Sequence, residues 1–180
     1  MAKFLRVIGI TIIVIIIIPL IAGFFIRKDY EVERSIEIDR HRDTVFNYLV
    51  MLKNQDDYSV WSSMDTSMKH TYTGVDGTVG FISAWESAGK TLGKGEQEIV
   101  AIQPGERIDY KLRFIKPFKA ESDVYLITEH SGEGKTLIRW GISGRMNYPF
   151  NVMLLFMNMN ESLGEDFSKG LEHLKNIIEK

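Results

Sequence analysis

The chain has 180 residues, of which 44% are hydrophobic and 26% are charged. This length suffices for one ordinary domain, and this composition excludes disordered, collagen-like and multi-span membrane proteins. The absence of cysteine excludes disulfide scaffolds, iron–sulfur clusters, thiol nucleophiles and cysteine-based zinc sites.

Charge is distributed unevenly along the chain. Of its 22 basic and 24 acidic residues, four basic and no acidic residues precede Asp29, which leaves residues 29–180 with 18 basic and 24 acidic residues. A domain with this excess of negative charge is repelled by phosphate backbones and by anionic lipid surfaces. We therefore expect no nucleic acid among the partners.

An apolar run from Val7 to Ile26 contains 20 residues without a charge. At about 1.5 Å per residue, a helix of this length spans roughly 30 Å, the thickness of the hydrocarbon core of a bilayer. A cleaved signal peptide is the alternative, but the apolar region of a signal peptide is usually ~7–15 residues long and is followed by a small-x-small cleavage site. The run in this chain is longer, and no clear site of that kind follows it. We therefore expect residues 1–28 to form a single-pass transmembrane anchor and residues 29–180 to form a separate domain.

The side of the membrane on which this domain lies depends on opposing signals. Lys3 and Arg6 favour an N-terminus in the cytoplasm, whereas Arg27, Lys28 and further arginines follow the apolar run. Because long domains translocate despite such charges, we favour a domain outside the cytoplasm, at the cell membrane. Only a few residues separate the run from the first strand pattern at Tyr30, so the domain is expected to lie against the bilayer surface.

The domain begins with a strand pattern at Tyr30–Asp39, where aliphatic residues alternate with glutamates. Arg42–Leu52 changes to helical spacing, and Asn54–Trp61 is expected to form a second short helix or turn. Six further strands are expected between glycine-containing turns, at Lys69–Tyr72, Thr78–Trp85, Gly95–Ile102, Arg107–Phe114, Ser122–Thr128 and Thr136–Met146.

Apolar and charged residues alternate in the strand expected at Arg107–Phe114. This pattern is typical of a sheet with one covered and one solvated face. From Pro149 near its start to Lys180, the last segment places apolar residues at spacings of three or four, which predicts a helix long enough to cross the sheet. One strand, two helices, six strands and one long helix make an antiparallel α+β domain.

Several stretches resemble the START-like (SRPBCC) superfamily, the helix-grip fold of polyketide cyclases and birch-pollen-allergen relatives. They are VERSIEID, VFNYL, Gly77–Gly80–Trp85, GKGEQEI, Pro104, the LRF–KPF segment and DFSKGLEHLK. The resemblance covers roughly residues 30 to 180, and with the apolar run it is similar to a membrane-anchored bacterial branch of the superfamily. It implies a curved antiparallel sheet of about seven strands wrapped on the long C-terminal helix, with a deep apolar cavity between them.

The sequence supplies side chains suited to lining such a cavity, because apolar pockets combine hydrophobic and aromatic residues with a few polar groups. The alternative is that the same side chains fill a solid core. The candidates at strand positions are Trp85, Tyr110, Leu112, Phe114, Tyr125 and Trp140, and those on the last helix are Met153, Phe156, Met157 and Phe167.

Arg34 is the first polar candidate for the site, because it is in register with Val32 and Ile36 on the predicted inward face. A buried arginine needs a carboxylate partner or an anionic ligand group. The alternatives are that Arg34 pairs with a structural acid or reaches past the edge of the sheet.

The stretch Phe150–Met159 is too apolar on all sides for a helix with one wet face. Methionine-rich surfaces adapt to ligands or partners of variable shape. This stretch is therefore expected to gate the cavity or to dip into the bilayer beside the anchor, unless loops cover it.

The sequence favours no metal site and no cofactor. Its four histidines are far apart and lack metal-binding spacings, so we expect them to be solvated. The acidic pairs Asp56/Asp57 and Glu165/Asp166 are adjacent in sequence, so each pair presents its carboxylates in different directions, and we expect them to face solvent.

Three functions remain open. The first is a membrane-tethered module that binds a lipid or another hydrophobic small molecule. The second is an enzyme of the cyclase or dehydratase kind, which would need an acid or base in the cavity. The third is a protein-interaction module that resembles the chaperone-activator relatives of the same fold, with the acidic outer face as its docking surface. The catalytic residues of the second function are not evident from spacing.

Overall fold

The computed structural model describes residues 2–89 and 92–180. Met1, the first residue of the predicted anchor, lies outside them. The described chain contains five α-helices, two 3-10 helices and seven strands. They are α1 (Ala2–Gly23), β1 (Asp29–Ile38), α2 (Arg42–Leu49), η1 (Leu52–Asn54), α3 (Gln55–Tyr58), α4 (Val60–Met64), β2 (Lys69–Thr73), β3 (Ile82–Glu86), β4 (Lys94–Gln103), β5 (Arg107–Lys116), β6 (Ala120–His130), β7 (Thr136–Arg145), η2 (Phe150–Leu155) and α5 (Met159–Ile178).

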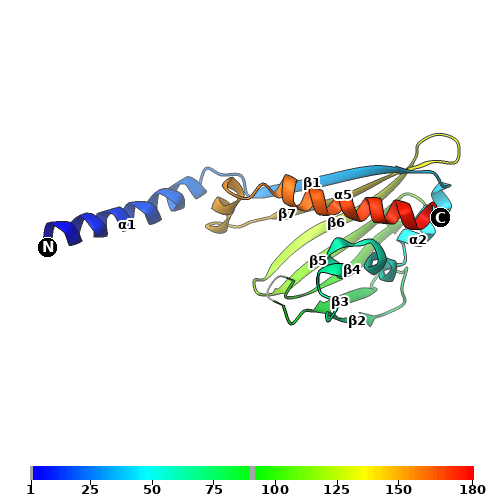
Figure 1. Ribbon diagram of the computed structural model, residues 1–180, viewed down its shortest axis with the longest axis horizontal. Coiled ribbons are helices and arrows are strands. Elements are labelled where there is room, and N and C mark those ends of the chain that lie inside the picture. The colour runs from blue at the N-terminus through cyan, green and yellow to red at the C-terminus, as the bar shows by residue number, and fades with distance from the viewer. Residues whose placement is uncertain (1, 90–91) are drawn as a thin grey trace.

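Helix α1 projects away from the rest of the chain as a single long rod (Figure 1). Its segment Arg6–Gly23 is long and apolar enough to cross a membrane. Its aliphatic side chains are exposed over most of its length, and Pro19 lies within the helix. Such a helix tolerates proline when it lies in a membrane.

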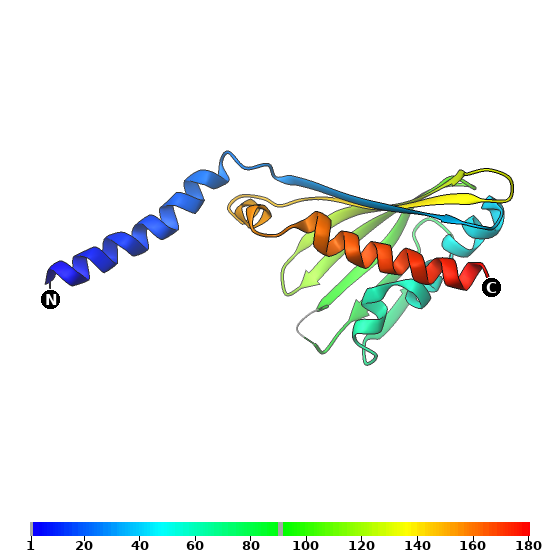
Figure 2. The same ribbon diagram turned by 45° about the horizontal axis from the view of Figure 1, so that its top comes forward.

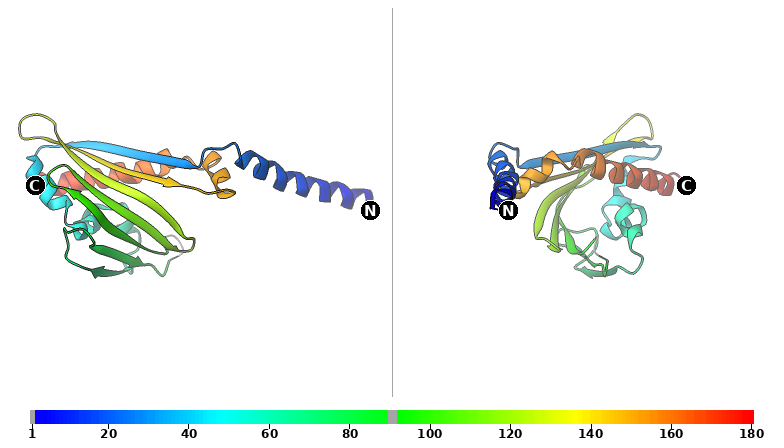
Figure 3. Two further views of the ribbon diagram at one scale, coloured as in Figure 1. Left: turned by 180° about the vertical axis from the view of Figure 1, so that it is seen from behind. Right: turned by 60° about the vertical axis from the view of Figure 1, so that its left-hand side comes forward.

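The seven strands form one antiparallel sheet in the order β1-β7-β6-β5-β4-β3-β2. The sheet curves strongly, and α5 lies across its concave face while α2 to α4 lie opposite the far strands (Figures 2 and 3). This arrangement confirms the predicted helix-grip α+β architecture with an apolar helix before it. We call the concave face the inner face and the other the outer face.

The two ends of the sheet are distinguished by their position relative to α1. The proximal end is where α1 joins, and there β1, β4 and β6 begin while β3, β5 and β7 end. The distal end is where α5 ends, near the C-terminus (Figure 1).

Alternation along the strands separates a buried inner face from a charged outer face. On the outer face the side chains pair across strands, as in Arg139 with Glu33 and Glu129, and Arg113 with Glu96 and Glu98. Exposed pairs of this kind contribute little stability each, but they keep the outer face solvated. The hydrophobic core therefore lies on the inner face, and its buried members on the strands and α5 are Val32, Ile38, Ile99, Ile108, Tyr110, Val124, Leu126, Ile138, Trp140, Ile142, Phe167, Leu171 and Leu174.

Most element boundaries differ from the sequence prediction by up to three residues, and two elements begin four or more residues later than predicted. The last helix begins at Met159 and not near Pro149, because the Asn158 side chain accepts a hydrogen bond from the Glu161 backbone N–H and caps the helix there. The strand expected at Thr78–Trp85 begins at Ile82, because Gly77 and Gly80 adopt positive φ angles in the preceding turn.

Gly170 of α5 is a test of how tightly the helix packs on the sheet. A Cβ at this position would lie 2.8 Å from Cζ3 of Trp140 and 3.3 Å from the carbonyl oxygen of Tyr58. Overpacking costs about 1–3 kcal/mol, whereas alanine gains about 1 kcal/mol of helix propensity over glycine. We expect Gly170→Ala to lower the free energy of unfolding by about 1–2 kcal/mol, measured by denaturant titration of the full chain in detergent.

The control for this substitution is Asn176→Ala on the exposed side of the same helix. We expect it to leave the free energy of unfolding unchanged or to raise it. A Gly170→Ala protein more stable than the parent would contradict the close packing of α5 on Trp140.

Glu37 makes the stability of the sheet fall in the acid pH range. Its carboxylate accepts hydrogen bonds from Lys135 at 2.8 Å and Ser131 at 2.6 Å. These hydrogen bonds, that of Lys135 first, hold the pKa of Glu37 below its ordinary value of 4.5. The stabilisation is therefore present above about pH 4.5 and is lost as pH falls through the lowered pKa of the folded state.

We expect Glu37→Gln to flatten this acid-side loss, because the neutral amide has no proton to gain. Thermal unfolding between about pH 2 and pH 7 measures the effect. Glu172→Gln on the exposed side of α5 is the control, and an unchanged acid profile in Glu37→Gln would contradict the role of Glu37.

Candidate functional site

The proximal part of the inner face is less completely packed than the distal part. At the distal end Ile38, Ile108 and Ile138 are fully buried in the hydrophobic core. At the proximal end the inward side chains of β3 and β5, among them Trp85 and Phe114, remain half-buried. The proximal inner face is therefore the part of the core that solvent or a ligand can reach.

Trp85 and Phe114 form the aromatic wall of this region. Their rings contact edge to face with centroids 6.0 Å apart. Gly95 lies between them on β4, and a Cβ there would come within 2.3 Å of the Trp85 ring. The Trp85 indole N–H donates to the Leu92 carbonyl at 3.0 Å, which fixes the ring over the glycine. Leu112 packs beside this wall, half-buried, on the same face of β5.

Two buried polar side chains, Gln97 and Tyr110, adjoin the aromatic wall. Gln97 pairs with Leu112 across β4 and β5, so Tyr110, two residues before Leu112, is its diagonal neighbour on the same face. The Gln97 Nε2 and the Tyr110 hydroxyl have no hydrogen-bond partner among the described residues. Burial raises the pKa of Tyr110 well above its ordinary value of 10, so the hydroxyl keeps its proton.

Unpartnered polar atoms in a core are costly and therefore informative. Leaving a buried donor or acceptor without a partner costs about 1–3 kcal/mol. Gln97 supplies an N–H donor and Tyr110 an O–H that donates or accepts. Together they can orient a neutral polar group of a molecule whose apolar part lies against Trp85 and Phe114.

Trp140 lies deeper, in an aromatic cluster that occupies the space under the middle of α5. Its ring stacks on Phe167 with centroids 4.6 Å apart and meets Tyr58 and Trp61 edge to face. Trp140 and Phe167 are buried, whereas Trp61 of α4 is half-buried. The predicted members Trp140 and Phe167 therefore pack on each other as core. The Trp140 indole N–H also has no partner among the described residues.

Arg34 points inward but is held by α5. Its guanidinium donates to the Asn160 carbonyl at 2.6 Å and to the Asn160 side-chain oxygen at 3.0 Å. A Cβ on Gly164 would lie 2.0 Å from Arg34 Nη2, so the arginine lies in a space that this glycine leaves. The guanidinium thus clamps the first turns of α5 onto β1.

Four of the predicted lining residues lie elsewhere. Tyr125 is on the outer face, where its hydroxyl donates to Glu33 at 2.8 Å and its ring lies under Arg107, because Val124 and Leu126 take the inward positions of β6. The others, Met153, Phe156 and Met157, are exposed on η2 and the residues after it, since α5 begins only at Met159.

A polar group around Asp56 was missed by the sequence reasoning. Asp56 accepts hydrogen bonds from Tyr72 at 2.7 Å and Ser62 at 3.3 Å, and His70 Nδ1 lies 3.7 Å from its carboxylate. His70 and Asp56 were expected to face solvent; both keep part of their surface exposed, but β2 and α3 also bring them into contact. No sequence spacing signals this contact, since it forms only in the folded domain.

Two surface hollows lie on the outer face. One of about 480 Å³ is lined by residues that include Glu31, Arg107, Asp109 and Tyr125. Another of about 350 Å³ lies beside it, toward Arg42 at the distal end. Both have a mixed lining of charged, polar and apolar residues, and neither is the predicted apolar cavity between the sheet and α5. Among residues 2–89 and 92–180, no three acidic or histidine side chains are grouped so as to hold a metal ion.

Comparison with known proteins gives one family. Residues 29–179 match the family model described as polyketide cyclase/dehydrase and lipid transport. A search of curated proteins found no match.

Solved structures share the fold at low sequence identity. A protein from Nitrosospira multiformis is 17% identical, with a TM-score of 0.59 over 82% of this chain and 94% of that one. Norcoclaurine synthase from Thalictrum flavum, in complex with dopamine and hydroxybenzaldehyde, is 10% identical, with a TM-score of 0.61 over 88% and 91%. The Aha1 dimer from Colwellia psychrerythraea is 13% identical, with a TM-score of 0.56 over 83% and 96%. At these identities the likeness shows the fold alone.

Tyr110 offers a test of whether the site is a core or a binding surface. Tyr110→Phe removes a buried hydroxyl without a described partner, so we expect the free energy of unfolding to stay equal or to rise by about 1 kcal/mol. Tyr72→Phe is the matched control, and it should lower stability because it loses the hydrogen bond to Asp56. Denaturant unfolding of both variants measures the difference. A destabilised Tyr110→Phe protein would show that the hydroxyl already has a partner and is not free to bind a ligand.

Proposed function

The chain belongs to the polyketide cyclase/dehydrase and lipid transport family of the START-like superfamily, and from this membership we propose that its domain binds a lipid or another hydrophobic small molecule at a membrane surface. The observation that carries the proposal is the pair of unpartnered polar atoms, on Gln97 and Tyr110, beside the half-buried aromatic wall of the proximal inner face. Pockets for apolar ligands combine such walls with a few polar groups that fix orientation.

The polar groups favour a neutral ligand over an anionic one. An anionic ligand would need a free positive charge in the site. The guanidinium of Arg34 on β1 points inward, but it already donates hydrogen bonds to the backbone and the side chain of Asn160. Gln97 and Tyr110 carry no charge at neutral pH and offer N–H and O–H groups. We infer an elongated apolar molecule with at least one carbonyl, ester or hydroxyl oxygen that accepts these hydrogen bonds.

The membrane tether is part of the same proposal. Residues 1–28 serve as a single-pass anchor and residues 29–180 as the binding domain, because α1 has the length and composition of a span. Only residues 24–28 separate α1 from β1. A binding site held this close to a bilayer samples molecules dissolved in the lipid at high local concentration. The side of the membrane that we favour for the domain is the non-cytoplasmic one.

The test is recovery of a ligand with the full chain. We expect native mass spectrometry of the protein released from membranes in a mild detergent to show a lipid-sized adduct, which organic extraction then identifies. Gln97→Leu should reduce occupancy roughly three- to tenfold, the effect of one lost hydrogen bond. Gln103→Leu, a change of the same kind at an exposed position of the same strand, should leave occupancy unchanged.

Two outcomes would count against this function. A protein mass without any adduct in every preparation would favour a protein-interaction role. An adduct whose occupancy responds to neither Gln97→Leu nor Tyr110→Phe would place the ligand outside the proximal inner face.

A further inference from the structure

The connection between β7 and α5 exposes an unusual number of large apolar side chains. Residues 147–159 contain no charged residue. Within them Phe150 is 63% exposed, Leu155 60% and Phe156 82%. Together with Phe24 and Phe25 after α1, which are 70% and 87% exposed, they form a set of side chains that we call the junction patch.

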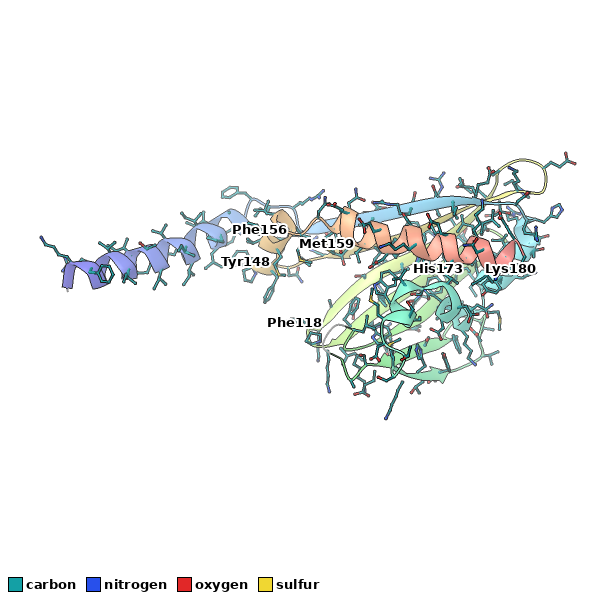
Figure 4. The ribbon with its side chains drawn as sticks, in the orientation of Figure 1. Phe118, Tyr148, Phe156, Met159, His173 and Lys180 are labelled. Carbon is teal, nitrogen blue, oxygen red and sulfur yellow. The ribbon has the colours of Figure 1, made fainter. Side chains whose placement is uncertain are left out.

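The junction patch is built around the end of α1 by specific contacts. Asn151 of η2 is completely buried, and its side-chain N–H groups donate to the carbonyl oxygens of Gly23 at 2.7 Å and Ile26 at 3.1 Å. The last carbonyls of a helix lack partners within the helix, so the bond to Gly23 satisfies a group that α1 leaves free, while Ile26 lies in the connection that follows. The rings of Phe24 and Tyr148 also pack together, with centroids 4.5 Å apart. In Figure 4 Tyr148 and Phe156 lie directly beside the end of α1.

These contacts set the depth of η2 relative to α1. A hydrogen bond of 2.7 Å to Gly23 places Asn151 at the level where the apolar helix ends. If α1 spans a bilayer, this level is the membrane–water interface, where aromatic side chains are enriched. Arg27 and Lys28, directly after the patch, are placed for contact with lipid head groups.

We propose that the junction patch inserts into the interface of the leaflet in which α1 ends, as a second membrane contact of the domain; this inference rests on the proposed membrane tether. The partner of the patch is the lipid surface, because the patch continues the apolar surface of α1. The hydrogen bond from Asn151 of η2 to Gly23 holds the patch at the end of that helix. The acidic character of residues 29–180 means that apolar insertion, and not attraction to anionic lipid, supplies the contact.

The proposed seating also orients the binding site. The patch precedes Met159, the first residue of α5, and lies at the proximal end of the domain (Figure 4). The first turns of α5 are clamped to β1 by Arg34 and Asn160. With η2 in the interface, the proximal inner face is turned toward the bilayer, and a lipid-soluble molecule reaches it without crossing bulk water.

Because the chain has no cysteine, single-cysteine variants report on one position each. We would reconstitute the full chain in phosphatidylcholine vesicles, attach an environment-sensitive fluorophore and add lipid that carries a nitroxide quencher near its head group. A label at Phe156→Cys should shift to shorter emission wavelength and be quenched. A label at Val75→Cys, on a turn where the side chain is 70% exposed, should show neither effect. Ile21→Cys, within α1, is the control for the tether.

The outcomes separate the two proposals. Quenching at Ile21→Cys without quenching at Phe156→Cys would overturn the second membrane contact and leave the tether intact. Absence of quenching at both positions would overturn the tether as well.

Asn151 provides a second measurement. Asn151→Leu removes both hydrogen bonds to the end of α1, so the label at Phe156→Cys should lose quenching while the label at Ile21→Cys keeps it. The matched control is Asn147→Leu in the same segment, where the side chain is exposed, and it should change neither signal. Equal quenching of the Phe156→Cys label with and without Asn151 would contradict the role of Asn151 in setting the depth of η2.

Discussion

Helix α5 comes into close contact with β1 and β7 because two of its residues have no side chain. At Gly164 the missing Cβ leaves room for the Arg34 guanidinium, and at Gly170 it leaves room for the Trp140 ring. Any larger residue at these positions would push the helix away from the sheet or displace those groups. The Arg34–Asn160 hydrogen bonds and the aromatic cluster around Trp140 both depend on this approach.

The close approach is confined to one side of the sheet, and this determines where a ligand site can form. Helix α5 lies along β1, while β2 to β5 curve away from it toward α3 and α4 (Figure 3). Tyr58, Trp61 and Phe167 fill the middle of the space that this curvature creates. Toward the proximal end the Trp85 ring covers Gly95, the wall of Trp85 and Phe114 stays half-buried, and Gln97 and Tyr110 are left with unused hydrogen-bonding groups. Because these two atoms also adjoin the half-buried aromatic wall, unlike the unpartnered indole N–H of Trp140 in the packed core, we regard them as the polar part of a site.

Much of this fold could be predicted from sequence because its signals are local. Alternation identified all seven strands, and the uncharged run identified α1. The start of α5 was missed because apolar spacing continues through Phe150–Met157, although Asn158 and Glu161 form a recognisable cap signal. Tyr125 was assigned to the wrong face although strict alternation with Val124 and Leu126 excludes it from the core.

The candidate site was predicted less completely, because it depends on contacts between distant residues. The sequence indicates that Arg34 points inward but not that Asn160, 126 residues later, engages it. The same holds for the group formed by His70, Asp56 and Tyr72, and for the unused atoms of Gln97 and Tyr110, whose significance appears only when every neighbour is known. Burial and pairing are properties of the folded chain, and a pattern of residue types does not contain them.

Asn151 connects the proposed membrane tether to the domain that carries the proposed binding site. In an otherwise apolar segment, Asn151 would normally be a cost, since burying an amide without partners is unfavourable. Its N–H groups donate to the carbonyls of Gly23 and Ile26, whereas its Oδ1 has no hydrogen-bond partner among the described residues. The cost is therefore offset only in part, and only while η2 stays on the end of α1. The domain therefore does not turn freely about residues 24–28. These two bonds tie η2 to the end of α1, so we expect a change in the tilt of α1 to move the start of α5 and the site beside it together.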